Sequence, residues 1–174
     1  MTATSPKLTA GAAFPSVTVS ALGGGLLAPA AQSGWRMIVI YRGKHCPLCK
    51  RYLKILDGML PDFASAGVNV MAMSGDPEEK AAADVQEQGW HFPVGYGLSV
   101  EQMKQLGLYI SAPRSPQETD RPFAEPGLFV INPEGQTQIV DVSNAPFARP
   151  DLAGVLAGIR LIQERQYPIR GTLA

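Results

Sequence analysis

The sequence contains few of the residues that build small secreted domains and metal centres. Its 174 residues include only two cysteines and two histidines. Two cysteines cannot form the disulfide framework of a small extracellular protein. In a chain of this length they are more typical of a catalytic or metal-binding role in a reducing compartment. The central question is therefore what these two cysteines do.

An excess of charge of one sign and long apolar runs are also missing. Fifteen Lys and Arg residues balance fifteen Asp and Glu residues. We therefore expect no nucleic-acid partner and no acidic disordered tail. No apolar run reaches the length that spans a bilayer, so we expect no membrane partner. Residues 8–31 are largely apolar, but Pro15 and four glycines interrupt them, which favours a cytoplasmic protein over an exported one.

The length fits one domain that covers residues 1–174. Alternating residues around a glycine-rich turn predict a β-hairpin within residues 14–27. Apolar runs predict strands at 37–41 and 68–73, and helical patterns predict helices at 47–60 and 77–88. This strand–helix–strand order predicts a parallel pair of strands with a right-handed crossover.

The second half of the chain predicts a different arrangement. A helix is expected at 99–106, and residues 107–126 carry no periodic pattern and should be irregular. Strands at 128–132 and 137–142 should form an antiparallel hairpin before a closing helix at 151–165. The whole order predicts an α/β fold of the thioredoxin-like type, with a central mixed sheet flanked by helices and an N-terminal hairpin extension.

Both cysteines lie in one tetrapeptide, Cys46-Pro47-Leu48-Cys49, where an apolar strand runs into a helix. Proline is favoured at the first helical position, so Cys46 should lie at the helix N-terminus. Unpaired backbone N–H groups and the helix dipole favour a thiolate there. Cys49, three positions later, lies within bridging distance. The motif predicts redox chemistry by a dithiol that cycles to a disulfide.

The residues around the motif are cationic, with no acid between positions 42 and 51. We therefore predict that the pKa of Cys46 is depressed, which makes this thiol the nucleophile. Cys49 faces the apolar side of the helix, so it should be less exposed and have a higher pKa. Cys46 would then attack the substrate, and Cys49 would resolve the adduct. The cations of this segment are Arg42, Lys44, His45, Lys50 and Arg51.

A zinc site is the alternative interpretation of a C-x-x-C motif. Zinc needs four ligands, and the remaining soft donors are His45 and His91. His45 is adjacent to Cys46, which is an awkward geometry for two ligands of one ion. The strand-to-helix context favours the redox interpretation.

Three segments resemble the AhpC/TSA, or peroxiredoxin-like, branch of the thioredoxin superfamily. The string YRGKHCPLC at 41–49 is similar to the YRGxWCPxC signature of a peroxiredoxin-like subgroup. The stretches PGLFVINPEG at 126–135 and QIVDVSNAPFARPD at 138–151 are similar to two further family segments. The resemblance covers most of the chain and implies a thiol-dependent antioxidant enzyme with no bound cofactor.

Two departures from the family pattern concern the site itself. The family carries a threonine three residues before the nucleophilic cysteine, where this chain has Gly43. The family also carries an arginine just before GLF, where this chain has Pro126. Thioredoxins place a cis-proline at that position, although an ordinary trans proline is the alternative. The resemblance leaves Arg42 as a partial substitute for the lost cation and matches Arg149 to a family arginine.

These features support more than one function. The first hypothesis is an oxidoreductase that reduces peroxides or disulfides through Cys46 and Cys49, with Arg42 and Pro126 in the site. A dithiol electron donor, linked to thioredoxin or glutathione, would reset it. The alternatives are a disulfide reductase without peroxidase activity and a redox sensor or adaptor without turnover. The resemblance also leaves a homodimer open.

Overall fold

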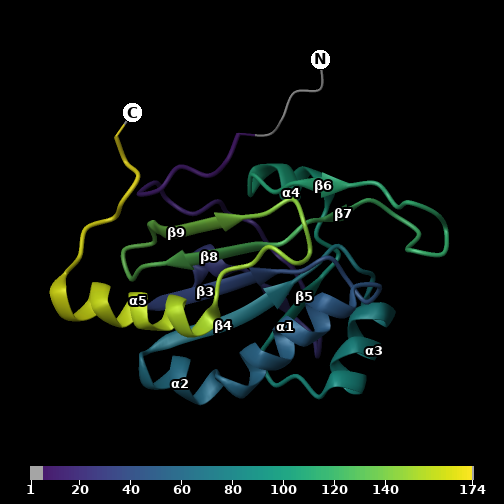
Figure 1. Ribbon diagram of the computed structural model, residues 1–174, viewed down its shortest axis with the longest axis horizontal. Helices are drawn as coiled ribbons and strands as arrows, with labels where there is room; N and C mark the ends of the chain where they lie inside the picture. The colour runs from purple at the N-terminus through teal and green to yellow at the C-terminus, as the bar shows by residue number, and fades with distance from the viewer. Residues whose placement is uncertain (1–5, 174) are drawn as a thin grey trace.

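The computed structural model describes residues 6–173, which fold around a seven-stranded mixed sheet with the strand order β2-β1-β5-β4-β3-β8-β9 (Figure 1). The elements in chain order are β1 (Val19–Ala21), β2 (Leu26–Leu27), the 3-10 helix η1 (Pro29–Ala31), β3 (Trp35–Ile40), α1 (Pro47–Gly58), α2 (Leu60–Ser65), β4 (Val68–Met73), α3 (Glu78–Gln88), β5 (Val94–Tyr96), α4 (Val100–Gln105), β6 (Ile110–Ser111), β7 (Phe123–Ala124), β8 (Gly127–Ile131), β9 (Thr137–Val142) and α5 (Leu152–Arg165).

The centre of the sheet is the predicted strand–helix–strand unit. Strands β3 and β4 pair in parallel from Trp35 opposite Val68 to Ile40 opposite Met73, and α1 and α2 connect them. On its other side β3 pairs antiparallel with β8, and β8 pairs with β9. Because β3 is an inner strand, with β4 and β8 on either side, the segment that follows its C-terminal end places Cys46 beside the interior of the sheet.

Two apolar cores lie on opposite faces of the sheet. Side chains from α1, α2, α3 and α5 pack with alternate residues of β3 and β4, among them the fully buried Leu53, Leu56 and Phe63. On the other face Phe14, Met103 and Phe129 pack with side chains of β1 and the α4 region. Both cysteines belong to the first core, so the redox motif is part of the packed interior.

Most predicted elements are confirmed, with three differences. The N-terminal hairpin is an edge of the main sheet rather than an appendage, because β1 also pairs with β5, a short strand that the apolar pattern did not predict. The helix predicted at 47–60 ends at Gly58, and α2 begins at Leu60. Residues 107–126 are not wholly irregular, since β6 and β7 pair within them. None of the helices in residues 6–173 is both long and apolar enough to cross a membrane.

Candidate active site

The site is built at the N-terminus of α1, where Cys46 is the capping residue and Pro47 takes the first helical position. The Cys46 Sγ accepts a hydrogen bond from the backbone N–H of Cys49 at 3.3 Å. Both cysteines are free thiols, and each is only 1% exposed. The expected difference in exposure between them is therefore wrong, because the segment before the helix is buried as deeply as its first turn.

The two thiols ionise in the predicted order. The pKa of Cys46 is lowered to about 6, chiefly because the Cys49 thiol donates a hydrogen bond to it. Burial opposes this shift, while the Cys49 backbone N–H and the nearby Arg42 guanidinium reinforce it. Burial raises the pKa of Cys49, and so does its hydrogen bond to the Cys46 sulfur. One negative charge is thus held on Cys46 while Cys49 keeps its proton.

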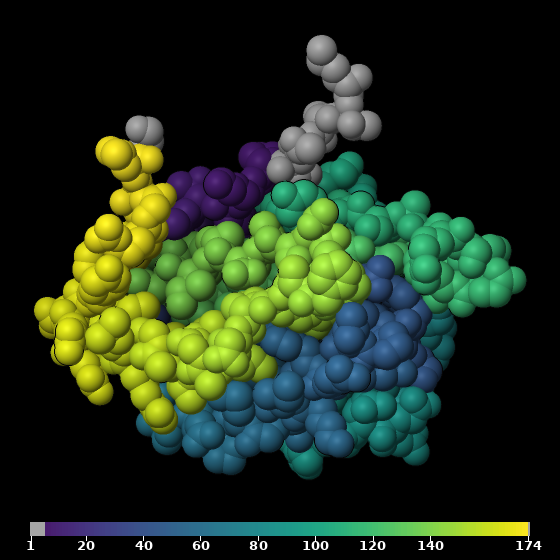
Figure 2. Space-filling model, viewed as in Figure 1, coloured from purple at the N-terminus to yellow at the C-terminus, as the bar shows by residue number. Residues whose placement is uncertain are grey.

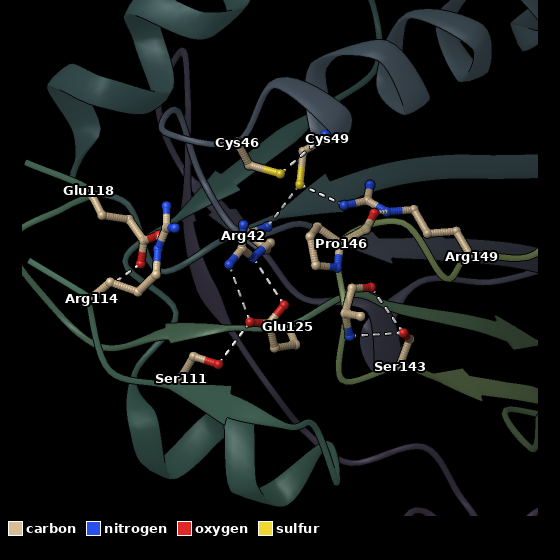
Figure 3. A network of polar contacts seen from close by, with 11 residues as sticks. Arg42, Cys46, Cys49, Ser111, Arg114, Glu118, Glu125, Ser143, Pro146 and Arg149 are labelled. Atoms are coloured by element: carbon tan, nitrogen blue, oxygen red, sulfur yellow. Dashed lines mark hydrogen bonds and ion pairs between the residues drawn. The ribbon is translucent and has the colours of Figure 1, made fainter.

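Two arginines from distant parts of the chain converge on the dithiol (Figure 3). The Arg149 Nη2 atom donates to the Cys49 Sγ at 2.7 Å, and the backbone N–H of Arg42 donates to the same sulfur at 3.4 Å. The Arg42 guanidinium pairs with the buried Glu125, with Nε 3.0 Å from Oε2. Arg149 comes from the loop between β9 and α5, which a hydrogen bond from the Tyr52 hydroxyl to the Pro150 carbonyl ties to α1.

The other cations near the motif do not contact the thiols. Lys44 pairs with Glu87 at 2.9 Å and Lys50 lies 3.7 Å from Asp84, both on α3. Burial, reinforced by the charge of Arg42, lowers the pKa of His45, so this residue favours its neutral form. Arg51 is exposed. The sequence predicted a general cationic environment around the thiols. That prediction is too broad, because acids of α3, a helix distant in sequence, neutralise the two lysines.

Gly43 is fixed by its surroundings as well as by its backbone. Its φ angle is +140°, a conformation that favours glycine. A β-carbon there would lie 2.7 Å from Oδ1 of Asp76, a buried carboxylate that accepts a hydrogen bond from the Lys44 backbone N–H. Burial raises the pKa of Asp76. The position where the family carries threonine is thus closed to any side chain in this structure.

Pro126 connects β7 to β8, next to Glu125. Every peptide bond in residues 6–173 is trans, so the cis alternative for Pro126 is wrong. Its carbonyl accepts a hydrogen bond from the Ser143 backbone N–H at 3.0 Å, which ties the start of β8 to the end of β9. The trans geometry is the ordinary one for a proline that enters a strand.

Within residues 6–173 no group of three or more His, Cys, Asp and Glu side chains is arranged so that it could hold a metal ion. His91 is exposed and pairs with Asp57 at 2.9 Å, near the C-terminal end of α1 and away from its first turn. His45 packs its ring against Phe123 at 4.5 Å. Trp90 and Phe92 stack in the core, with Tyr41 against the edge of Trp90, as expected for packed aromatics.

Sequence reasoning missed a groove beside the dithiol. It has a volume of about 340 Å³ and is lined by residues of α1 and of the 146–152 segment. The blue and yellow-green surfaces of these two parts of the chain adjoin in Figure 2. Leu48, Ile55 and Phe147 line it, and Phe147 is 80% exposed. Arg51 and Arg149 lie on the same groove. Only the fold brings these two segments together, because about a hundred residues separate them in sequence.

The fold and the paired thiols at a helix N-terminus define a thioredoxin-like protein of the peroxiredoxin type. The model of the AhpC/TSA family matches residues 10–140, and the chain belongs to that family. Sequence and structure therefore agree on an oxidoreductase scaffold. No curated protein matches the sequence.

Solved structures agree on the fold. A peroxiredoxin-like protein from Aquifex aeolicus has a TM-score of 0.77 at 16% identity, over 91% of this chain and 90% of that one. A cysteine-to-serine mutant of peroxiredoxin 6 from Arenicola marina has a TM-score of 0.76 at 18% identity, over 91% and 75%. The peroxidoxin BcpB from Mycobacterium tuberculosis has a TM-score of 0.73 at 17% identity, over 89% and 98%. These likenesses confirm the predicted thioredoxin-like fold.

Proposed function

We propose that this protein is a thiol peroxidase in which Cys46 is the nucleophile and Cys49 resolves the oxidised intermediate. One observation carries the proposal: a buried thiol with a pKa of about 6 at the N-terminus of α1, in contact with a second thiol. At neutral pH such a group is largely thiolate, and the thiolate is the reactive form.

The proposed cycle has two chemical steps. The Cys46 thiolate attacks one peroxide oxygen, the O–O bond breaks, and the leaving alkoxide or hydroxide takes up a proton, which leaves a sulfenic acid on Cys46. The Cys49 sulfur then attacks the Cys46 sulfur. The S–OH bond breaks, and the hydroxide combines with the proton lost by Cys49 to form water. Two electrons from an external dithiol, thioredoxin- or glutathione-linked, restore both thiols.

Burial of the sulfurs favours a small oxidant. Each cysteine is 1% exposed, so a peroxide reaches Cys46 with less rearrangement than a protein disulfide requires. Arg42, held by Glu125, is the cation closest in role to the arginine replaced by Pro126. We place Arg42 near the oxygen that leaves and Pro126 as a residue that shapes the β8 end of the site. A chain of this length with only two cysteines favours a reducing compartment, such as the cytoplasm, for this enzyme.

A disulfide reductase is the second candidate, because the family threonine is absent. Gly43 supplies no hydroxyl to orient a peroxide, and Asp76 fills the space beside it. A disulfide substrate needs no such hydroxyl: the Cys46 thiolate would form a mixed disulfide that Cys49 resolves. A redox sensor without turnover would use the same disulfide to alter a surface.

Stopped-flow oxidation of the reduced protein separates these candidates. We expect hydrogen peroxide to oxidise Cys46 at least about a hundredfold faster than a free thiolate does, which is about 2.7 kcal/mol of barrier lowering. Cys46→Ser should abolish the reaction, whereas Cys49→Ser should retain the first step and accumulate sulfenic acid. A rate no faster than that of a free thiolate, with rapid reaction toward a small disulfide, would favour the reductase. Redox-dependent partner binding without donor consumption would favour the sensor.

A further inference from the structure

The contact between Arg149 and the second thiol has no counterpart in the cycle described above. Its Nη2 atom donates to the Cys49 Sγ at 2.7 Å, and its Nε atom is anchored by the Pro146 carbonyl at 2.8 Å. The guanidinium carbon lies 5.1 Å from the centre of the Tyr52 ring. These three contacts hold the guanidinium plane in place against the sulfur.

Arg149 is also a cation without a carboxylate partner in the described part of the chain. None of the ion pairs in residues 6–173 includes it, and its Nη1 atom is buried without a hydrogen-bond acceptor. Arg42, by contrast, is neutralised by Glu125. A guanidinium cannot lose its proton in a protein, so this half-buried charge persists through the whole cycle. In the reduced site the Cys46 thiolate balances it, and the charge of Arg149 helps to lower the pKa of Cys46. Once Cys46 has been oxidised and has lost its charge, the anion that can balance Arg149 is a thiolate on Cys49, whose sulfur Nη2 already contacts.

We propose that Arg149 is the catalytic residue of the second step, which holds Cys49 as a thiolate once Cys46 has been oxidised. This inference rests on the proposed two-cysteine cycle. Before oxidation the Cys46 thiolate accepts the Cys49 proton in a hydrogen bond and repels a second negative charge, which keeps Cys49 protonated. Oxidation of Cys46 removes both effects. Burial still opposes ionisation of Cys49, and Arg149 then opposes burial.

The bonds and the proton of this step balance in the same way for a peroxide and for a disulfide substrate. With a sulfenic acid, the Cys49 sulfur bonds to the Cys46 sulfur, the S–OH bond breaks, and hydroxide takes the proton of Cys49 to give water. With a mixed disulfide on Cys46, the outer sulfur leaves as a thiolate and takes that proton. In both cases the Cys49 sulfur passes through a negatively charged state beside Nη2. A hydrogen bond to a charged group of this kind corresponds to about ten- to a hundredfold in rate.

The test loads Cys46 with a reagent that needs no peroxidase activity. One equivalent of methyl methanethiosulfonate transfers its methylthio group to the Cys46 thiolate and releases methanesulfinate. Attack by Cys49 then expels methanethiol and closes the disulfide. Acid quenching and mass spectrometry follow the adduct and the disulfide separately. At pH 8, well above the pKa of Cys46, we expect Arg149→Gln to slow disulfide closure at least tenfold and to change the loading step less than threefold. The pH dependence of closure should shift upward.

Two variants guard this test against a merely structural effect. Arg149→Lys keeps the charge, so it should recover part of the closure rate. Arg51→Gln removes an exposed arginine from the same groove and should leave both steps unchanged. Equal slowing of loading and closure in Arg149→Gln, or unchanged closure, would overturn the proposal. A wild-type protein that closes from the methylthio adduct but does not react with peroxide would instead overturn the proposed peroxidase activity.

Discussion

At the scale of single residues, the space beside Gly43 is as important for the site as the contacts of the thiols, because no larger side chain fits there. Gly43 combines a φ of +140° with a neighbouring carboxylate that leaves no room for a β-carbon. Asp76 is held there by the Lys44 backbone N–H at 2.7 Å. The family threonine is therefore absent, and the Asp76 carboxylate occupies the space that its side chain would need. The sequence shows the missing threonine, but it cannot show the position of Asp76, because 32 residues separate Lys44 from Asp76.

Gly43→Thr tests this close fit. The variant introduces both backbone strain and a clash with Asp76, so we expect it to lower the free energy of unfolding by about 2–4 kcal/mol. We also expect no gain in the rate of reaction with peroxide. Urea denaturation and the stopped-flow assay measure the two quantities.

Gly24→Thr is the matched control for Gly43→Thr. Gly24 also has a positive φ, +109°, but nothing lies within 4 Å of a β-carbon built there. It should cost about 1 kcal/mol from strain alone. A stable Gly43→Thr protein with faster peroxide reaction would show that the threonine can be restored, contrary to the steric argument.

At the scale of elements, α3 supplies the acids that neutralise the cations around the motif. Asp84 on α3 is fully buried, and neither of its carboxylate oxygens has a hydrogen-bond partner. Its closest counter-charge is the Lys50 ammonium at 3.7 Å. Burial raises the pKa of Asp84 to about 6. The burial of the Asp84 carboxylate thus carries an energetic cost at neutral pH.

The pH dependence of stability reveals this cost. Between the unfolded pKa near 4 and the folded pKa of about 6, the native state holds a proton that the unfolded state has lost, so stability falls as pH rises through this window. The loss from Asp84 reaches up to about 3 kcal/mol at pH 7. Asp84→Asn should remove it, so the variant should gain stability relative to wild type at pH 7 and lose that advantage near pH 4.

Thermal or urea unfolding across this pH range measures the Asp84 effect. Glu79→Gln, an exposed position on the same helix, is the control and should show no such pH-dependent gain. An Asp84→Asn variant that is less stable than wild type by the same amount at both pH values would contradict a raised pKa.

At the scale of the whole molecule, local patterns predicted the parts that depend on local chemistry. The β3–α1–β4 unit, the β8–β9 hairpin, α5 and the helix start at Pro47 follow from apolar spacing and proline geometry. The pairing of β1 with β5 and the short β6–β7 ribbon depend on non-local contacts. Strands of two or three residues are too short to show a sequence pattern that predicts such contacts. The trans state of Pro126 is likewise decided by its surroundings.

The site was predicted in part for the same reason. The proline and the helix N-terminus locate Cys46 and Cys49 from sequence alone. The Glu125 partner of Arg42, the acids opposite Lys44 and Lys50, and the Arg149 contact all come from segments far away in the chain. Tertiary folding therefore neutralises Lys44 and Lys50, retains Arg42 beside the thiols and adds Arg149 from a distant loop.

The central claim is that Cys46 is a thiolate near neutral pH while Cys49 is not. The most direct measurement is the rate of iodoacetamide alkylation of each cysteine in the reduced wild-type protein across a pH series, read by mass spectrometry of peptides. We predict that the Cys46 rate rises with a midpoint at about pH 6 and that Cys49 stays unreactive well above this pH. A Cys46 midpoint near the ordinary thiol value of about 8.5, or earlier ionisation of Cys49, would contradict the account.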